Sequence, residues 1–299
     1  MSTEPPGAVL TDTVRDTIIG SIVSAGDAVM QVYETDFNVD VKQDNTPITE
    51  ADRKANRIIH RCLDSLSLSI GGGKEEKLPI LSEEGREIPY ETRSGWMAYW
   101  LVDPLDGTKE FVQRNGEFTV NIALIEKSAA GYLPSAGFVY LPVLRTLYWG
   151  IYGSGVFRLR RVPSQESSDE ARNPDRLPPP GDHDPGKPVR IVASRSHLDP
   201  KTGEYIDGIR TTSGGKVELV RAGSSLKLCR IADGSADLYP RFGPTMEWDI
   251  AAGHGVCRAA GYRVAELSTG KELSYNKADL KNGHFLAGRE EMIQKFSRL

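Results

Sequence analysis

Residues 100–108 read Trp-Leu-Val-Asp-Pro-Leu-Asp-Gly-Thr, and this stretch decides the fold. Its apolar beginning is typical of a buried strand that delivers Asp103, and Pro104 predicts a turn directly afterwards. Asp106 follows at three-residue spacing, so both carboxylates can converge on one small volume. Hard oxygen ligands in this arrangement suit Mg²⁺ or Mn²⁺.

The two residues after Asp106 extend this interpretation. Gly107 and Thr108 offer backbone N–H groups, and a helix that begins there would attract an anion to its N-terminus. A metal ion and a phosphate would then meet at one point. The plainer alternative is that Asp-Gly marks a turn and that Asp106 is an exposed helix cap.

Two further acidic positions lie outside this stretch. Glu83, within Ser-Glu-Glu, follows an apolar segment at 79–81, and Asp249 stands in the first turn of a small-residue helix at 248–253. Taken singly, Glu83 is by default a solvated loop acid, and Asp249 is a first-turn acid favoured by the helix dipole. Together with 103–106 they predict a group of acidic ligands.

The remaining apolar patterns predict mixed helices and strands. Thr11 or Asp12 can cap a first helix, and Thr49 can open a second one. Expected strands are 78–81, 99–102, 118–125, 137–141, 146–149 and 155–159. Beyond residue 188 the pattern alternates as strand 189–193, helix 224–232, strand 236–239, helix 246–260 and strand 262–265. The expected class is α+β in the first part and α/β in the second.

A proline-rich stretch separates these two parts. Residues 161–188 hold many of the chain's 18 prolines amid Ser, Asp and Glu. Such a composition predicts an exposed connector that does not pack a core. We therefore expect an N-terminal half at 1–160, which contains most of the acidic candidates for metal binding, the connector at 161–188 and a C-terminal half at 189–299. That the second half binds substrate is implied only by the family resemblance given below.

Composition narrows the class of protein. The chain has 299 residues with 37 basic and 41 acidic side chains, a net charge of −4 that argues against a nucleic-acid binder. Three scattered cysteines suggest neither a disulfide framework nor a thiolate zinc site, which fits a reducing compartment. No leader pattern or apolar run of about 20 residues occurs, so we expect a soluble cytoplasmic protein without a membrane span. Peripheral contact with the inner membrane face stays open.

The acidic motifs resemble those of a known family. Ser82-Glu83-Glu84, the 103–108 motif and Trp248-Asp249-Ile-Ala-Ala-Gly253 appear in the order seen in lithium-sensitive, Mg²⁺-dependent phosphatases. That family includes inositol monophosphatase, fructose-1,6-bisphosphatase and the 3'(2'),5'-bisphosphate nucleotidases. The resemblance spans the first helix to about residue 287 and implies a layered αβαβα sandwich with the site between its halves.

Within this family the chain is similar to the CysQ-type nucleotidases. The similar stretches are 42–49, 107–111, 115–121, 194–197, 223–227 and 238–245. Inositol monophosphatases typically carry Thr-Asn where this chain has Lys109-Glu110. The departures from the family pattern are the long connector and Met246-Glu247, and we expect neither to touch a metal ligand.

The resemblance implies a metal site and a route to catalysis. The implied ligands of two Mg²⁺ ions are Glu83, Asp103, the main-chain carbonyl of Leu105, Asp106 and Asp249, with Asp103 bridging. Crowded carboxylates repel one another, so their proximity makes sense with divalent cations between them. Thr108, oriented by Asp44, would position the attacking water with help from Glu83. Asp44 is also a candidate ligand for a third Mg²⁺, although a turn-forming role ahead of Pro47 is compatible.

The implied substrate is a small nucleotide that carries two phosphates, and about four negative charges. Lys227, His197 and Arg241 are candidates to grip the phosphate that is not cleaved, although a solvated lysine and a structural histidine are the common alternatives. Neutral donors would be Ser196, Ser224 and Ser225. The substrate would also meet Glu83, Leu105, Asp106, Gly107, Thr108 and Asp249.

The activity implied is Mg²⁺-dependent hydrolysis of adenosine 3',5'-bisphosphate (PAP) to AMP and phosphate. The 3'-phosphorylated phosphosulfate (PAPS) would give adenosine phosphosulfate (APS), which implies a role in sulfate assimilation. The subgroup's usual form is a monomer. Rival hypotheses are an inositol monophosphatase or sugar bisphosphatase of the same family, and a non-catalytic regulator that keeps the pocket without turnover.

Overall fold

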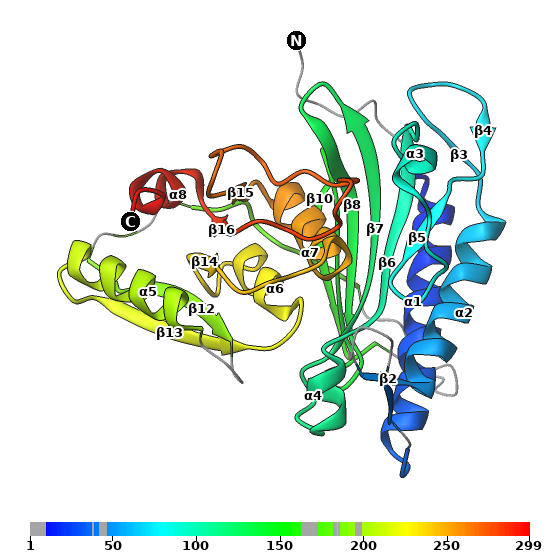
Figure 1. Cartoon of the computed structure of the whole chain (residues 1–299), viewed down its shortest axis with the longest axis horizontal. Coiled ribbons are helices and arrows are strands. Elements are labelled where there is room, and N and C mark those ends of the chain that lie inside the picture. Colours follow the sequence, from blue (N-terminus) through cyan, green and yellow to red (C-terminus); the bar gives the residue numbers. More distant parts are fainter. Residues whose placement is uncertain are drawn as a thin grey trace.

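The structure is a computed structural model that describes residues 10–37, 39–41, 47–162, 173–181, 184, 186–194 and 199–299 (Figure 1). Three expected site residues, Asp44, Ser196 and His197, lie outside the described residues. Within the described part of the chain, no helix is both long and apolar enough to cross a membrane. Cys62, Cys229 and Cys257 are free thiols.

Two capped helices open the fold. In α1 (Asp12–Tyr33) the Thr11 side chain accepts a hydrogen bond from the Val14 N–H at 3.3 Å. In α2 (Glu50–Ser65) the Asp52 carboxylate accepts from the Thr49 N–H at 2.8 Å, and the Thr49 hydroxyl accepts from the Ala51 N–H at 3.2 Å. These caps satisfy donors that the first turn leaves free. Both predicted helix starts are confirmed.

A seven-stranded sheet, here called the large sheet, has the order β11-β10-β9-β8-β7-β6-β5. Its strands are β5 (Ile80–Ser82), β6 (Ala98–Asp106), β7 (Thr119–Ser128), β8 (Gly131–Leu141), β9 (Thr146–Ile151), β10 (Gly155–Arg160) and β11 (Asp175–Arg176). All neighbours are antiparallel except β5 and β6. Side chains alternate between its two faces, so Trp100 packs with α1 and α2 while Leu101 packs toward the opposite side.

A five-stranded sheet, here called the small sheet, has the order β13-β12-β14-β16-β15. Its strands are β12 (Val189–Ser194), β13 (Val217–Ala222), β14 (Leu238–Arg241), β15 (Arg263–Glu266) and β16 (Phe285–Gly288). Strand β12 runs parallel to β13 and β14, and β16 is antiparallel to its neighbours. Ile191 faces one layer of helices and Val192 faces the other.

The helices complete five layers (Figure 1). Helices α6 (Leu226–Ala232) and α7 (Glu247–Ala260) lie between the sheets, and α5 (Pro200–Thr212) and α8 (Glu290–Phe296) cover the outer face of the small sheet. A Cβ atom on Gly137 would lie 2.0 Å from the Ala252 carbonyl oxygen, so glycine lets α7 approach β8 closely. The expected αβαβα sandwich is confirmed. The shorter elements are β1 (Val39–Val41), β2 (Pro47–Thr49), β3 (Leu68–Ser69), β4 (Glu75–Glu76), α3 (Tyr90–Arg93) and α4 (Thr108–Val112).

The expectation for the connector is wrong in one part. Residues 175–176 form β11, which pairs with β10, and Leu177 is buried in the core cluster between the sheets. Burial of the Leu177 side chain removes its apolar surface from water. This burial is favourable even though prolines surround Leu177 in the sequence. The same core cluster holds residues from both expected halves. The boundaries at 160 and 189 stay a prediction.

Candidate active site

The bend predicted at Pro104 is an irregularity inside β6. Across the ladder to β7, Asp103 lies opposite Asn121 and Asp106 lies opposite Thr119, so β6 holds one extra residue between the two pairs. On a regular strand, the side chains of residues three apart point to opposite faces of the sheet. One extra residue between them brings both side chains to the same face. The Leu105 N–H donates to Asp103 Oδ1 at 3.0 Å and fixes this bulge. The three-residue spacing therefore brings both carboxylates toward one volume.

Glu83 reaches the same place from the next strand. Ser82 on β5 pairs with Val102 on β6, so Glu83 and Asp103 both follow paired residues of a parallel ladder. The Glu83 N–H donates to the Val102 carbonyl at 3.1 Å and extends the pairing by one residue. Glu83 and Asp103 are therefore neighbours, although Asp103 lies within β6, which continues to Asp106.

Glycine is required at position 107 by the backbone conformation there and by the Ser224 side chain beside it. Its φ of 89° lies in the left-handed region, and α4 begins at the next residue. The Ser224 hydroxyl lies 2.9 Å from the Asp106 carbonyl and 2.8 Å from the Glu117 carbonyl. A Cβ on Gly107 would lie 2.1 Å from the Ser224 oxygen. Glycine thus lets Ser224 tie the turn after Asp106 to the opposite half of the molecule.

Ser225 connects Asp106 of β6 with Asp249 of α7. Its hydroxyl lies 3.0 Å from Asp106 Oδ2 and 2.9 Å from the Asp249 carbonyl, and it accepts from Asn121 Nδ2 at 3.0 Å. The Thr119 hydroxyl also lies 3.3 Å from Asp106 Oδ2. Sequence reasoning missed Thr119 and Asn121, although alternate residues of one strand share a face. Ser224 and Ser225 are both engaged with protein atoms, and donation to substrate stays a prediction for them.

Asp249 is held by the start of α7. Its Oδ2 accepts a hydrogen bond from the Met246 N–H at 2.9 Å. The expectation that Met246-Glu247 touches no metal ligand is therefore wrong, because the residue before a helix presents its N–H to an acid in the first turn. Glu247, with no exposed surface, is part of this support.

The negative charges of the buried carboxylates repel one another. Burial, together with the charges of Glu83, Asp106 and Asp249, raises the pKa of Asp103 well above its usual range. Burial and the Asp106 charge raise the pKa of Asp249 to about 7. Burial also raises the pKa of Asp106, whereas the Lys227 ammonium and the Ser225 hydroxyl work against the shift. A group of buried carboxylates with too few cations of its own fits a divalent ion.

The donor set is hard oxygen, the kind that Mg²⁺ prefers. Among the described residues, no three acidic, histidine or cysteine side chains already surround a point where an ion could sit. Asp103, Asp106 and Asp249 nevertheless lie within electrostatic reach of one another. The side chains that would hold the metal are therefore neighbours, and the exact ligand set stays a prediction.

A cationic pocket adjoins the carboxylates. Asp106, Lys227, Arg241 and Asp249 line one cavity, together with Tyr239. Lys227 is 8% exposed, and burial lowers its pKa to about 8 although the Asp106 charge opposes that shift. The Arg241 Nε atom is buried and has no hydrogen-bond partner among the described residues. A buried donor without a partner is costly and suits an anionic ligand.

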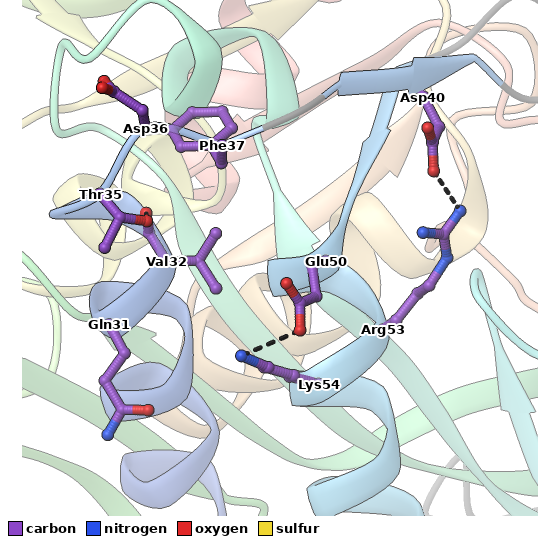
Figure 2. A pocket seen from close by; sticks show the side chains of 9 residues that line it. All are labelled: Gln31, Val32, Thr35, Asp36, Phe37, Asp40, Glu50, Arg53 and Lys54. Atoms are coloured by element: carbon purple, nitrogen blue, oxygen red, sulfur yellow. Dashed lines mark hydrogen bonds and ion pairs between the residues drawn. The ribbon is translucent and has the colours of Figure 1, made fainter.

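Two other features complete the description. The Thr108 hydroxyl, at the start of α4, lies 3.4 Å from the carbonyl of Leu105, one of the expected metal ligands. A separate pocket between the end of α1 and the start of α2 contains two cations, Arg53 and Lys54 (Figure 2). Both are paired within it, to Asp40 at 2.8 Å and to Glu50 at 3.0 Å, so this pocket has no spare positive charge for a phosphate.

Comparison with known proteins agrees with this geometry. The 3'(2'),5'-bisphosphate nucleotidase CysQ of Salmonella typhimurium is 42% identical over 254 residues, which cover 84% of this chain and 89% of that protein. The nucleotidase CysQ of Escherichia coli K12 is 43% identical over 255 residues, with the same coverage of 84% and 89%.

Solved structures give the same picture. CysQ from Bacteroides thetaiotaomicron, a bacterial member of the inositol monophosphatase family, superposes with a TM-score of 0.79 at 40% identity and covers 94% of this chain and 99% of that one. An inositol monophosphatase of Thermotoga maritima shares the fold, with a TM-score of 0.69, 21% identity and coverage of 96% of both chains. The model of the inositol monophosphatase family matches residues 10–298, and the chain belongs to that family.

Proposed function

We propose that this protein is a Mg²⁺-dependent 3'(2'),5'-bisphosphate nucleotidase that hydrolyses the 3'-phosphate of PAP to give AMP and phosphate, and converts PAPS to APS. The observation that carries the proposal is the buried Lys227 beside the carboxylate group, in a pocket that also contains Arg241. A net charge of −4 would repel a substrate with two phosphates, so local cations are needed. The names of the similar nucleotidases support the same substrate class.

Each group of residues has a distinct task in this reaction. Glu83, Asp103, Asp106, Asp249 and the Leu105 carbonyl would hold the metal. When bound, Mg²⁺ ions neutralise charge on the phosphoryl group and favour attack by water. Thr108 orients the attacking water, and its hydroxyl already lies beside the Leu105 carbonyl. Lys227 and Arg241 bind the phosphate that stays on the nucleotide.

Several finer points belong to the same proposal. The residues named above would hold two Mg²⁺ ions, with Asp103 contributing to both, and Asp44 would hold a third and orient Thr108. His197 and Ser196 complete the grip on the retained phosphate. The protein works as a monomer in the cytoplasm, within sulfate assimilation.

The rival substrate within the family is an inositol phosphate or a sugar bisphosphate. Inositol monophosphatases among the solved structures share the fold at 21 to 23% identity, whereas the nucleotidases of Salmonella typhimurium and Escherichia coli K12 are 42 and 43% identical over 84% of this chain. A monophosphate also has no second phosphate to meet Lys227. These points favour the nucleotide.

The test is phosphate release from PAP, PAPS and inositol 1-phosphate by the wild type and by Lys227→Met, which keeps the apolar stem without the charge. Loss of one charge-assisted contact costs about 1.5 to 3 kcal/mol, or roughly ten- to 150-fold in kcat/KM for PAP. Hydrolysis of inositol 1-phosphate stays nearly unchanged. The control is Lys54→Met, which removes a cation paired to Glu50 in the other pocket.

Three outcomes would contradict the proposal. A wild type that prefers inositol 1-phosphate would assign the protein to the rival substrate class. An equal loss on both substrates in Lys227→Met would make Lys227 a general electrostatic residue. Absence of any turnover would favour the non-catalytic regulator.

A further inference from the structure

The loop at 274–282, between β15 and β16, contacts both sides of the molecule. On the large-sheet side, the Tyr275 N–H donates to the Tyr132 carbonyl at 3.0 Å, and the Ser274 hydroxyl accepts from the Tyr132 N–H at 3.1 Å. The loop therefore extends from the small sheet to the beginning of β8. Its position depends on both halves of the chain.

Arg93, at the end of α3, makes the main hydrogen bonds that hold the loop on the large-sheet side. Its guanidinium donates to Asn276 Oδ1 at 3.0 Å and to the Lys277 and Ala278 carbonyls at 2.6 and 3.0 Å. The Asn276 amide returns a hydrogen bond to the Arg93 carbonyl at 2.7 Å. Arg93 and Asn276 are each only 3% exposed. Asn276 has a φ of 57°, a left-handed conformation that asparagine adopts more readily than most residues.

On the α7 side, the Glu247 carboxylate holds the loop through hydrogen bonds. Its carboxylate accepts from the Asn276 N–H at 2.7 Å, from the Lys277 N–H at 3.0 Å and from Lys277 Nζ at 2.7 Å. Glu247 has no exposed surface. A buried carboxylate that is satisfied by two backbone donors and one ammonium is tightly constrained in position.

Asn282 holds the residues just before Glu247. Its amide donates to the Met246 carbonyl at 2.8 Å, and its backbone N–H donates to the Thr245 carbonyl at 2.8 Å. Met246 is the residue whose N–H binds the Asp249 carboxylate. The loop therefore fixes both the start of α7 and the donor that orients Asp249.

We propose that Arg93, Asn276 and Glu247 form a clasp that positions Asp249 for metal binding, although none of the three is a metal ligand. The inference rests on the proposed function, because it takes Asp249 as a ligand of Mg²⁺. The clasp connects α3 of the large-sheet side to the first turn of α7, so it sets how the Asp249 carboxylate meets Asp103 and Asp106. Outer residues that orient metal ligands commonly contribute about ten- to 100-fold to metal affinity.

The test measures Mg²⁺ binding to the full chain by calorimetry without substrate, alongside activity at varied Mg²⁺. Asn276→Gly keeps the left-handed backbone and removes the side-chain bonds to Arg93. Glu247→Gln keeps the volume and removes the charge that binds Lys277. For each variant we expect Mg²⁺ affinity to fall by about ten- to 100-fold, while KM for PAP at saturating Mg²⁺ changes little.

The matched control is Arg289→Met. Arg289 is also buried, at 9% exposure, and it donates to Asp237 at 2.8 Å at the far end of the small sheet. We expect this variant to lose stability and to bind Mg²⁺ like the wild type. A thermal unfolding scan without Mg²⁺ identifies any variant that fails to fold, and Glu247→Gln, which is closest in shape to the native residue, then decides the outcome.

The outcomes separate the clasp from the function. A wild type that binds no Mg²⁺ would overturn the proposed function. A wild type that binds Mg²⁺, together with unchanged affinity in Asn276→Gly and Glu247→Gln, would overturn the clasp alone. Equal loss of affinity in Arg289→Met would also overturn it, because the effect would then be a general loss of stability.

Discussion

The large sheet and the small sheet differ in the contacts that hold them. Asp103 and Asp106 belong to β6, an inner strand of the large sheet, where backbone pairing with β5 and β7 and one bulge fix their positions. The small sheet contributes Arg241 at the end of β14, and its own end is held by side-chain ion pairs around Asp237. Backbone pairing thus places the carboxylates on β6 and also Arg241, which lies opposite Phe285 of β16, whereas the ion pairs around Asp237 hold the end of the small sheet that is away from Arg241.

The largest effect is expected from breaking the large-sheet side. Asp106→Asn removes one charge from the proposed metal site, and we expect kcat/KM to fall by about 10³-fold, since metal ions contribute several kcal/mol of transition-state stabilisation. Mg²⁺ affinity falls with it. Phosphate release and calorimetry measure the two losses on the same preparation.

The same variant should be more stable without metal. Burial raises the pKa of Asp106, which means that its charge is unfavourable in the folded state. We therefore expect Asp106→Asn to melt at a higher temperature than the wild type in chelator, with the order reversed in excess Mg²⁺. A lower melting temperature in chelator would show that the Asp106 carboxylate is stabilised by its protein contacts alone.

Thr108→Ala tests chemistry apart from metal binding. Its hydroxyl lies beside the Leu105 carbonyl and carries no charge, so we expect kcat to fall by about 10²-fold, in the range of groups that position a transferred proton. Mg²⁺ affinity should stay near that of the wild type. Thr108→Ser keeps the hydroxyl and is the control, and near-normal kcat in Thr108→Ala would remove Thr108 from the mechanism.

The part of the site on the large sheet could be predicted because its residues lie close together in the sequence. Asp103, Asp106 and Gly107 lie in one short run whose spacing, with a strand before it, already implies convergence. The bulge between Asp103 and Asp106 is absent from that pattern, since the periodicity of a strand says nothing of one extra residue. Thr119 and Asn121 required the register of β7 against β6.

The clasp could not be predicted, for a similar reason. Arg93 and Asn276 are separated by 183 positions along the chain, and neither belongs to a recognisable motif. Leu177 was missed because its proline-rich surroundings hide a single apolar residue that follows an edge strand. Contacts between distant, weakly patterned segments depend on the packing of the whole fold, which composition and spacing do not encode.

The small-sheet side gives the smallest expected effect on activity. Asp237 is 1% exposed and accepts from Arg190 Nη2 and Arg289 Nη1, both at 2.8 Å. Asp237→Asn leaves these guanidinium groups without their counter-charge. Breaking a buried ion pair costs about 3 kcal/mol of unfolding free energy. Activity per folded molecule should be unchanged, because the cluster lies outside the group of proposed metal ligands.

The pH dependence of this loss identifies its cause. Burial would raise the pKa of Asp237, but hydrogen bonds from Arg190 and Arg289 outweigh burial and lower it. A carboxyl with a depressed pKa adds stability that is fully present above its unfolded value of about 3.9, and that stability is lost as the pH falls through the folded value. Urea unfolding of wild type and Asp237→Asn should therefore differ most at neutral pH, and the difference should shrink below a pH of about 4. A difference that stays constant down to acid pH would mean that packing at Asp237, and not its charge, holds this end of the small sheet.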